Sequence, residues 1–454
     1  MSQSKVPDTV SAADRLRELI EKNTVYYKFD ATEFSYISDE RVKDIVTSDN
    51  VARIFRYDVD FQGLHMPPDK RDNFIRNITS HLIPQKIFAT AVLGRLPLTL
   101  LPWMMKGIAR YFQDAKSPKN IVVVSEKADL NSQRLMSERY EPFQARFCVA
   151  DLHSKHYDTD LSEWTIPVVF TESDRIEGKV FKARVHWSYQ KLEGVSRSTE
   201  DGALTEYLAL KKVTDPDDIE AWKEFLNDTR DVASTFMDAV CCNTAFMFKG
   251  SYYMMSELAH CDLDEFMRSN TTGGTHPDSS LTVAWLLQQL RDLGDALYVF
   301  EMLSRADKSE IHNVLVFRES ENYRIRPQMC PGHHREHHAE NEPPGNTLVP
   351  GDWHAWALGC VVVQILVWYV GGYSALQAFL AIQSEETGQK QFWLRRDGQF
   401  MLCQTVSMKL EELRVAFGDG KMEEVVDAVS ELLQMNRGRR MSCGSFGTAM
   451  EELM

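Results

Sequence analysis

The chain has 454 residues, of which 43% are hydrophobic and 26% are charged, and its formal net charge is −15. This length and composition are those of an ordinary soluble globular protein with room for two or three domains and a well-buried core. Proteins that bind nucleic acids or anionic membranes in a general way are usually basic. The acidic balance therefore predicts that neither a nucleic acid nor a membrane is a main partner.

The eight cysteines are scattered, and no two of them are spaced as C-x-x-C. The sequence therefore supports neither a zinc ribbon nor a thiol redox motif. Several cysteines lie in apolar runs, as reduced and buried thiols do. No apolar run stands near the N-terminus, so we expect no secretory signal. These features predict an intracellular protein, cytoplasmic or nuclear.

Residues 1–165 predict a mainly helical region. Ala12 to Ile20 carries apolar residues at helical spacing, and Ser11 precedes this segment as an N-cap. Residues 24–66 predict short helices and turns. The apolar stretch 87–108 is interrupted by an arginine and two prolines, so it predicts two packed helices and not a membrane span. A short strand is predicted at 120–124.

The pattern changes to strands from about residue 166. Strands are predicted at 180–185 and 206–213, a helix at 217–232, and a hairpin of 246–248 with 252–255 around Lys249-Gly250. Two helices, 262–267 and 281–302, follow. Short strands are then predicted at 313–317 and 323–325, a loop at 327–351, and mainly helices over the remainder.

The most apolar run in the chain is Trp356 to Val370, which is 15 residues long and contains Gln364. A membrane span needs about 20 apolar residues, and no cluster of lysine or arginine flanks this run to anchor it. We therefore predict a helix that is buried in the core of a large domain. A membrane segment is the alternative.

In this order the elements resemble a eukaryotic-type protein kinase domain over residues 166–454, and the whole chain resembles a fungal group of kinase-like proteins with a helical N-terminal region. The matching motifs are Leu208–Lys211 (V-A-I-K strand), Tyr252–Leu258 (hinge strand), Gln288–Leu290 (helix before the catalytic loop), Asn313–Phe317 (end of that loop), Trp356–Cys360 with Trp368–Gly372 (buried helix) and Asn436–Met441 (late arginine turn).

The resemblance implies an α+β, two-lobed protein-kinase-like fold with a strand-rich N-lobe and a helical C-lobe. The predicted domains are a mainly helical N-terminal region at 1–165, the kinase-like N-lobe at 166–259 and the helical C-lobe at 260–454. Fold alone does not establish function, so the motifs have to be weighed one by one.

The resemblance also implies a nucleotide site for ATP, whose residues would be Gly178, Val180, Ala209, Lys211, Glu257 and Leu258. Lys211 would hold the phosphates and form an ion pair with Asp228, with Glu224 as a second candidate partner. That pair could equally serve only to hold the lobe together. Of the glycine loop G-x-G-x-x-G only Gly178 remains, and the loop looks shortened. A plain β-turn is therefore the alternative to a phosphate-binding flap.

The residues that would carry out phosphoryl transfer depart from the kinase pattern. Counted back from Asn313, the position of the catalytic aspartate holds Lys308, and Asp307 lies one residue too early unless the loop bulges. The metal-binding D-F-G is replaced by Pro327-Gln328-Met329. No carboxylate is left there to hold Mg²⁺, and Asn313 remains as a single weak ligand.

Three further features complete the comparison. Gly345 replaces a glutamate that pairs with the late arginine in kinases, here Arg440, and His354 replaces an aspartate at the start of the buried helix. The histidine cluster His333, His334, His337 and His338 contains pairs four residues apart. It is interpreted as a solvated loop, with a transition-metal site or a pH-sensitive contact as alternatives.

We predict a kinase-fold protein with impaired phosphoryl transfer, that is, a pseudokinase that acts as a binding or regulatory module for protein partners. One alternative is an atypical ATP-dependent Ser/Thr protein kinase of low activity that uses Lys211, Asp307 and Asn313. A second alternative is an interaction scaffold that binds no nucleotide and docks a partner through residues 1–165. Whether the chain is an enzyme stays open at this point.

Overall fold

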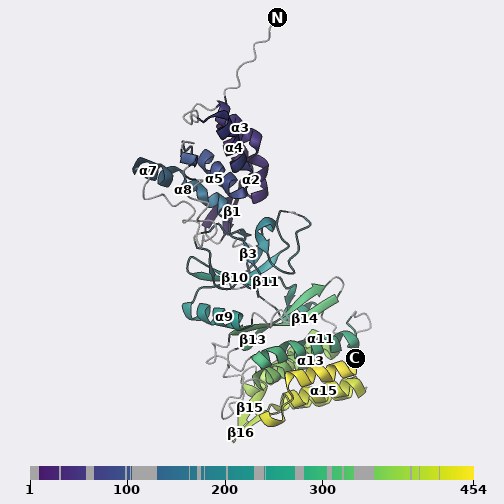
Figure 1. Cartoon of the computed structure of the whole chain (residues 1–454). Coiled ribbons are helices and arrows are strands. Elements are labelled where there is room, and N and C mark those ends of the chain that lie inside the picture. The colour runs from purple at the N-terminus through teal and green to yellow at the C-terminus, as the bar shows by residue number, and fades with distance from the viewer. Residues whose placement is uncertain are drawn as a thin grey trace. The chain divides into compact units, whose positions relative to one another are not determined.

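The computed structural model describes residues 10–454, apart from 30–31, 58–65, 98–99, 103, 105–129, 163, 171–174, 178, 201–202, 230–239, 241, 271–280, 304–308, 320–321, 332–351, 389–390, 398 and 419. The chain, which Figure 1 draws in full, forms two compact units. Unit 1 comprises residues 1–212 and 244–254, and unit 2 comprises residues 213–243 and 255–454. Helices and mainly antiparallel strands occur together, which confirms the predicted α+β class.

The first part of unit 1 is mainly helical. Its helices are α1 (Ala12–Lys22), α2 (Asp39–Ile45), α3 (Ser48–Tyr57), α4 (Pro68–Thr79), α5 (Leu82–Leu93), α7 (Leu130–Arg139), α8 (Glu141–Gln144) and η4 (Ala145–Phe147). The hydroxyl of Ser11 accepts a hydrogen bond from the backbone N–H of Asp14, which confirms the predicted N-cap. The helices share one apolar core, in which Leu16, Ile54 and Phe88 are fully covered.

One hairpin in this region was not predicted. Strands β1 (Val25–Phe29) and β2 (Thr32–Tyr36) pair antiparallel, with Phe29 opposite Thr32. The expectation of only helices and turns over 24–66 is therefore wrong at this point. Alternate residues of β1 are buried, since Tyr27 and Phe29 face the interior while Tyr26 and Lys28 are exposed.

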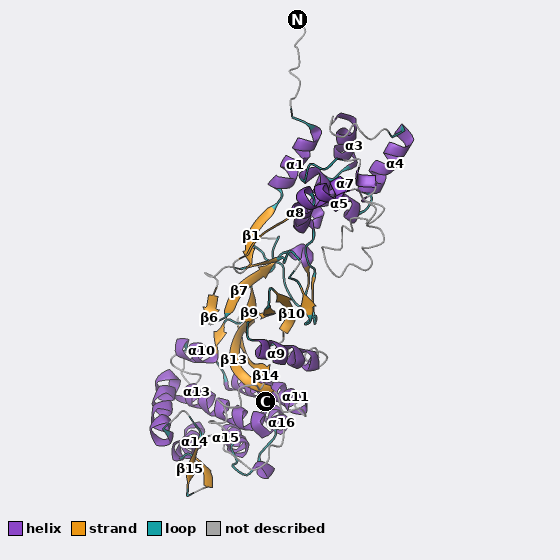
Figure 2. Cartoon of the chain, turned by 90° about the vertical axis from the view of Figure 1, so that its left-hand side faces the viewer, coloured by secondary structure: helices purple, strands orange, loops and turns teal. Residues whose placement is uncertain are grey.

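A sheet of seven strands follows, in the order β4-β10-β11-β9-β7-β5 with β6 paired to β7, and Figure 2 shows its central strands side by side. The strands are β4 (Thr159–Asp160), β5 (Val168–Val169), β6 (Arg175–Glu177), β7 (Val180–Val185), β9 (Leu208–Val213), β10 (Cys242–Phe248) and β11 (Ser251–Glu257). A separate parallel pair is formed by β3 (Leu152–His153) and β8 (Gln190–Lys191), next to η6 (Trp187–Tyr189). The strands predicted at 180–185 and 206–213 are confirmed.

The hairpin predicted around Lys249-Gly250 is also confirmed. Both turn residues have positive φ angles, 47° and 77°, as the tight turns of two-residue hairpins require.

The first hairpin and the sheet share one aromatic cluster. The ring of Phe29 lies 5.0 Å from that of Phe170, 5.2 Å from that of Phe248 and 4.9 Å from that of Tyr253, measured between ring centres. Such edge-to-face and tilted pairs add to the burial of apolar area. The predicted boundary at residue 166 therefore falls within unit 1, and whether the segments on its two sides fold separately stays a prediction.

Unit 2 is mainly helical. Its elements are α9 (Pro216–Thr229), β12 (Cys261–Asp262), α10 (Leu263–Ser269), α11 (Val283–Leu303), β13 (Ser309–Glu319), β14 (Asn322–Pro331), α13 (Asp352–Thr387), β15 (Trp393–Arg396), β16 (Gln399–Leu402), α14 (Gln404–Phe417), α15 (Gly420–Leu432), η7 (Arg437–Arg439) and α16 (Cys443–Leu453). Helices α11, α13, α14, α15 and α16 enclose one apolar core. The antiparallel sheet β12-β13-β14 packs beside α11.

Helix α13 contains the predicted buried segment, which confirms that this run is a core helix within unit 2. Trp356, Leu366 and Trp368 are at most 2% exposed, and the indole N–H of Trp368 lies 3.0 Å from the carbonyl oxygen of Met267. The helix is long and apolar enough to cross a membrane by length and composition, and 67% of its most apolar window is buried in the protein. It is kinked at Gly372, where φ is 73°.

The hairpin β13–β14 is longer than predicted. The short strands expected at 313–317 and 323–325 are the central part of strands that run from Ser309 to Glu319 and from Asn322 to Pro331. Residues 327–331 therefore continue a strand and do not begin the predicted loop. The remainder of that loop lies outside the described residues.

Candidate functional site

Three of the predicted nucleotide-site residues lie on one face of the large sheet. Val180 on β7 stands directly opposite Lys211 on β9, and Lys182 stands opposite Ala209. Residues that face each other across an antiparallel pair, and residues two apart on one strand, share a side of the sheet. Val180, Ala209 and Lys211 are half-buried, whereas the residues between them, such as Leu210, are buried on the other face. The three residues therefore share one face of the sheet, and their role in a nucleotide site stays a prediction.

The link that should form a phosphate-binding flap is very short. Glu177 on β6 is paired with Val180 on β7, so only Gly178 and Lys179 connect the two strands. A G-x-G-x-x-G flap needs several residues to place backbone N–H groups around a phosphate. The register of β6 with β7 favours the interpretation of a plain β-turn. Gly178 itself lies outside the described residues.

Asp228, the predicted partner of Lys211, lies near the end of α9 and is exposed. It belongs to unit 2, whereas Lys211 belongs to unit 1. The predicted ion pair between the two side chains therefore remains a prediction.

Glu257 and Leu258 end the predicted hinge strand. Glu257 is the last residue of β11, and its carboxylate accepts a hydrogen bond of 2.8 Å from the guanidinium of Arg326 on β14. That guanidinium also lies 4.7 Å from the ring centre of Phe317. Leu258 follows directly and is half-buried. The carboxylate of Glu257 is thus used to connect β11 with β14, a contact that the sequence did not reveal.

Asn313, the predicted weak metal ligand, lies within β13. Its side-chain oxygen accepts a hydrogen bond of 2.8 Å from the backbone N–H of Val314. The pairing of β13 with β14 shifts register between Ile311 and Asn313, which is a β-bulge. A bulge inserts one extra residue into a strand. Asp307 likewise lies one residue before the position of the catalytic aspartate, which Lys308 occupies.

The residues at the D-F-G position are part of the hairpin. Gln328 stands opposite Asn313, and Met329 stands opposite Ile311. Met329 is 4% exposed and belongs to the apolar core of unit 2. An amide, a proline and a buried thioether offer none of the anionic oxygens that Mg²⁺ prefers.

Several predicted residues lie outside the described part of the chain. They are Gly178, Asp307, Lys308, Gly345 and the histidines of 333–338. Among the residues that the structure does describe, no group of three or more His, Cys, Asp or Glu side chains is arranged to hold a metal ion. The interpretations of the histidine cluster stay open.

A buried polar network on α11 was not predicted from the sequence. The carboxylate of Asp292, which is 2% exposed, accepts hydrogen bonds from Gln288 at 2.6 Å and Arg291 at 2.8 Å, and it lies 3.5 Å from Arg324 of β14. The side-chain oxygen of Gln289 accepts from the backbone N–H of Ile325 at 2.8 Å. Gln288 and Gln289, which were part of the kinase resemblance, therefore help to fix the hairpin to α11.

Arg440, the late arginine of the kinase resemblance, and His354, which departs from that pattern, both lie at the beginning of α13. The guanidinium of Arg440 donates two hydrogen bonds to the carbonyl oxygen of Gln434, at 3.1 and 3.0 Å, and lies 5.2 Å from the ring centre of Trp356. His354 is 2% exposed at the beginning of α13. Arg440 thus contacts the beginning of the central helix, and His354 is buried there.

The structure describes the side chains of six cysteines, and all six are free thiols. Burial raises the pKa of Cys148 to about 11, and burial likewise raises the pKa of Cys403 to about 11. A thiol with a raised pKa carries little thiolate, the nucleophilic form, near neutral pH. These two cysteines therefore behave as structural residues, as expected from the sequence.

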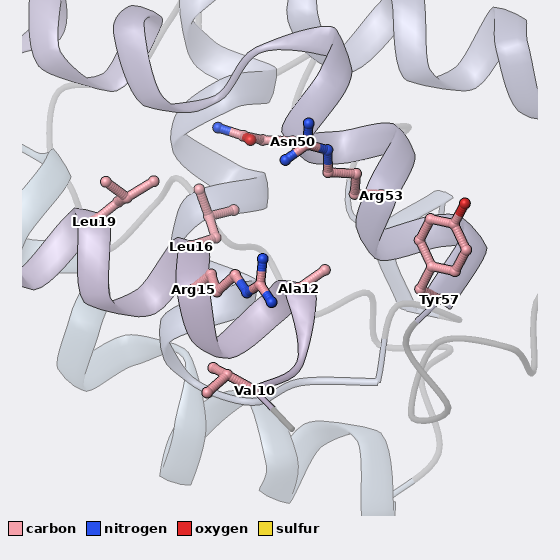
Figure 3. A pocket seen from close by; sticks show the side chains of 8 residues that line it. All are labelled: Val10, Ala12, Arg15, Leu16, Leu19, Asn50, Arg53 and Tyr57. Atoms are coloured by element: carbon pink, nitrogen blue, oxygen red, sulfur yellow. The ribbon is translucent and has the colours of Figure 1, made fainter. Parts of the chain in front are cut away.

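A pocket of about 360 Å³ lies between α1 and α3 in unit 1. Figure 3 shows its lining, which comprises Val10, Ala12, Arg15, Leu16, Leu19, Asn50, Arg53 and Tyr57. On α1 the lining residues follow Ala12 by three, four and seven positions. On α3 they follow Asn50 by three and seven positions, so each set forms one helix face. These periodic sets are visible in the sequence, but it does not show that the two faces meet.

No protein-family model matches the chain, and no curated protein matches it in sequence.

Proposed function

We propose that the chain is a protein-kinase-fold pseudokinase that acts as a binding or regulatory module. The observation that carries the proposal is the placement of Lys211 on β9, with Val180 opposite and Ala209 on the same face. In protein kinases the phosphate-binding lysine lies on the third strand, and the next helix carries its carboxylate partner. Here β9 is the third strand of the antiparallel run β6-β7-β9, and α9 follows it.

The elements of unit 2 support the same kinase-like layout. The long helix α11 is followed by the hairpin β13–β14, and then by the buried helix α13 around which the other helices pack. A helix before the catalytic loop, a hairpin around the metal site and a central buried helix are what the kinase resemblance implies for the C-lobe. The two-lobed arrangement is part of the proposal.

Three features support impaired phosphoryl transfer. The β6–β7 link is only two residues long, Met329 at the D-F-G position is buried in a strand, and the oxygen of Asn313 accepts a backbone hydrogen bond. Phosphoryl transfer depends on metal ions and donors that neutralise charge on the β- and γ-phosphates. A site without carboxylate ligands for Mg²⁺ lacks this stabilisation, and ATP would serve at most as a bound effector.

A weak Ser/Thr protein kinase is the second candidate, and one observation favours it. The bulge between Ile311 and Asn313 is an irregularity of one residue next to the segment that contains Asp307. If this extra residue shifts the chain before β13 by one position, Asp307 would stand where a kinase has its catalytic base. This kinase would use Lys211, Asp307 and Asn313.

An interaction scaffold without nucleotide binding is the third candidate. The pocket between α1 and α3 favours it, because this pocket lies in the N-terminal region and involves none of the kinase motifs.

A thermal-shift titration with ATP, in EDTA and in Mg²⁺, tests the proposal. A ligand at about a hundredfold excess over Kd stabilises the folded state by about 2.7 kcal/mol. We expect a saturable, metal-independent rise in Tm that disappears in Lys211→Met. The matched control is Lys212→Met, because Lys212 lies on the opposite face, with its ammonium 5.8 Å from the ring centre of Tyr253. A rise that requires Mg²⁺ would favour the weak kinase, and no rise with either buffer would favour the scaffold.

A further inference from the structure

The α1–α3 pocket is cationic in a chain that is strongly acidic. Its lining contains Arg15 from α1 and Arg53 from α3 but no carboxylate, whereas the chain carries a net charge of −15. Arg53 is exposed, and it makes no salt bridge with any residue in the described part of the chain. The nearby Asp14 is bound by Ser11 and Arg17, and these contacts lower its pKa, the hydrogen bond from Ser11 contributing most. Arg53 therefore presents its positive charge at the pocket, and Asp14 is already bound elsewhere.

The same pocket has an apolar floor and an apolar rim. Leu16 is 2% exposed and closes the bottom, while Leu19, Val10 and Tyr57 are 41%, 43% and 72% exposed. Large side chains with this exposure, gathered around a cavity next to arginines, are typical of surfaces that bind other proteins. Tyrosine and arginine are also the residue types that most often dominate binding energy at such surfaces.

We propose that the α1–α3 pocket binds a short segment of a partner protein in which a carboxylate side chain lies beside an aliphatic or aromatic one. The carboxylate pairs with the guanidinium of Arg53, which is planar and suited to bidentate contact. The apolar side chain covers Leu16 and Leu19. Charge complementarity with Arg53 selects this occupant, since a basic segment would meet this guanidinium and no carboxylate among the lining residues.

This inference deepens the proposed binding role by naming the chemistry of a partner. It does not depend on nucleotide binding, because the pocket shares no residue with the sheet face around Lys211. Loss of peptide binding and loss of the ATP-induced shift can therefore be observed separately. Arg56 provides a matched control, since it is exposed on the same helix three residues from Arg53 but does not line the pocket.

The test is a peptide array probed with the full-length chain. Ten-residue peptides with randomised flanks carry a central Glu-Leu, Asp-Phe, Lys-Leu or Lys-Phe pair, and the strongest acidic peptides are then titrated by fluorescence anisotropy. We expect the wild type and Arg56→Glu to bind acidic peptides in preference to basic ones. Arg53→Glu should weaken binding by at least about tenfold, because the charge that recognises the ligand is reversed. The affinity should also fall as salt is raised.

Several outcomes would overturn the proposal. These are the absence of binding to acidic peptides, equal binding of acidic and basic peptides, and unchanged binding in Arg53→Glu. Sedimentation velocity tests whether the wild type associates with itself. Self-association that is lost in Arg53→Glu would assign the pocket to a second copy of the chain. A variant without residues 1–9 that binds the peptides at least about tenfold more tightly would assign it to the chain's own N-terminus. Circular dichroism of both charge-reversal variants verifies that they are folded.

Discussion

Gly294 of α11 and Gly447 of α16 meet at a helix crossing so close that a β-carbon on Gly294 would lie 2.9 Å from the amide nitrogen of Gly447. The obstacle is backbone, which cannot rotate away as a side chain can. We therefore expect Gly294→Ala to lower the free energy of unfolding by about 1–3 kcal/mol, the usual cost of overpacking. Urea unfolding followed by circular dichroism measures this change.

Gly420→Ala is the control for this prediction. Gly420 is the first residue of α15, and a β-carbon built there would meet nothing within 4 Å. Alanine at such a helical position is expected to be neutral or to stabilise by up to about 1 kcal/mol. If both alanine variants unfolded at the same urea concentration as the wild type, the close crossing would not exist.

Asp292 is expected to be the most sensitive charged residue in the network between α11 and β14. Its buried carboxylate faces Arg291 at 2.8 Å and Arg324 at 3.5 Å. Asp292→Ala removes the buried anion that both guanidinium groups contact, while Asp295 still lies 3.8 Å from Arg291. Breaking a buried pair from one side typically costs about 3–5 kcal/mol. A double-mutant cycle with Arg324→Ala measures the coupling. A loss below about 1 kcal/mol for Asp292→Ala would show that the network is not a structural unit.

Glu386 of α13 is expected to make stability depend on pH. Its carboxylate accepts hydrogen bonds from the backbone N–H groups of Gln404, at 2.6 Å, and Thr405, at 2.8 Å, at the beginning of α14. Burial acts to raise the pKa of Glu386, but the hydrogen bonds from Thr405 and Gln404 outweigh it and hold the pKa below its ordinary value of 4.5. The ionised form is therefore the one that stabilises the fold.

Protonation of Glu386 is linked to unfolding, because its pKa is lower in the folded than in the unfolded chain. A carboxyl group whose pKa is lowered by folding stabilises the protein above its unfolded pKa, and this contribution is lost as the pH falls through the folded pKa. Glu386→Gln should thus cost about 1 kcal/mol at pH 7, a modest value because the group is exposed to solvent. The difference between wild type and variant should shrink below pH 4.5. Unfolding curves at pH 7 and pH 4 measure it, and a constant difference would refute the assignment.

Much of the fold could be predicted because local signals and tertiary structure agree. Ser11 caps α1 as expected, and the alternation in Val180–Val185 correctly predicted a strand. Hairpin β15–β16 was missed although Asp397-Gly398 is a strong two-residue turn signal. In contrast, Asp30-Ala31 contains no glycine or asparagine, so hairpin β1–β2 gives no such signal.

The remaining features depend on contacts between distant segments. Strand β13 is longer than predicted because it pairs with β14 along residues 327–331, which were predicted to begin a loop. The bulge at Asn313 exists only in the paired strands, so neither strand's sequence reveals it. The α1–α3 pocket depends on two helix faces about 40 residues apart in the chain, from Ala12 to Arg53. Periodicity reveals each face by itself, but only packing brings the arginines together.

The aromatic cluster around Phe29 predicts that the first 165 residues cannot be removed from unit 1. A fragment 166–454 would expose Phe170, Phe248 and Tyr253, whose rings lie against Phe29 in the full chain. In the full chain, Phe29→Ala is expected to cost about 3–5 kcal/mol. The fragment should therefore aggregate or lose its cooperative transition, as judged by size-exclusion chromatography and calorimetry. A fragment that unfolds cooperatively at the temperature of the full chain would support independent domains instead.

The pseudokinase proposal is tested most directly by transfer of the radiolabelled γ-phosphate of ATP to a generic protein substrate or to the chain itself in the presence of Mg²⁺. The comparison is between the wild type and Asp307→Ala, which removes the single candidate base. We predict that the two proteins give the same background, because no carboxylate stands at the position where a kinase binds its metal. Transfer by the wild type that Asp307→Ala abolishes would contradict the proposal and identify a weak kinase.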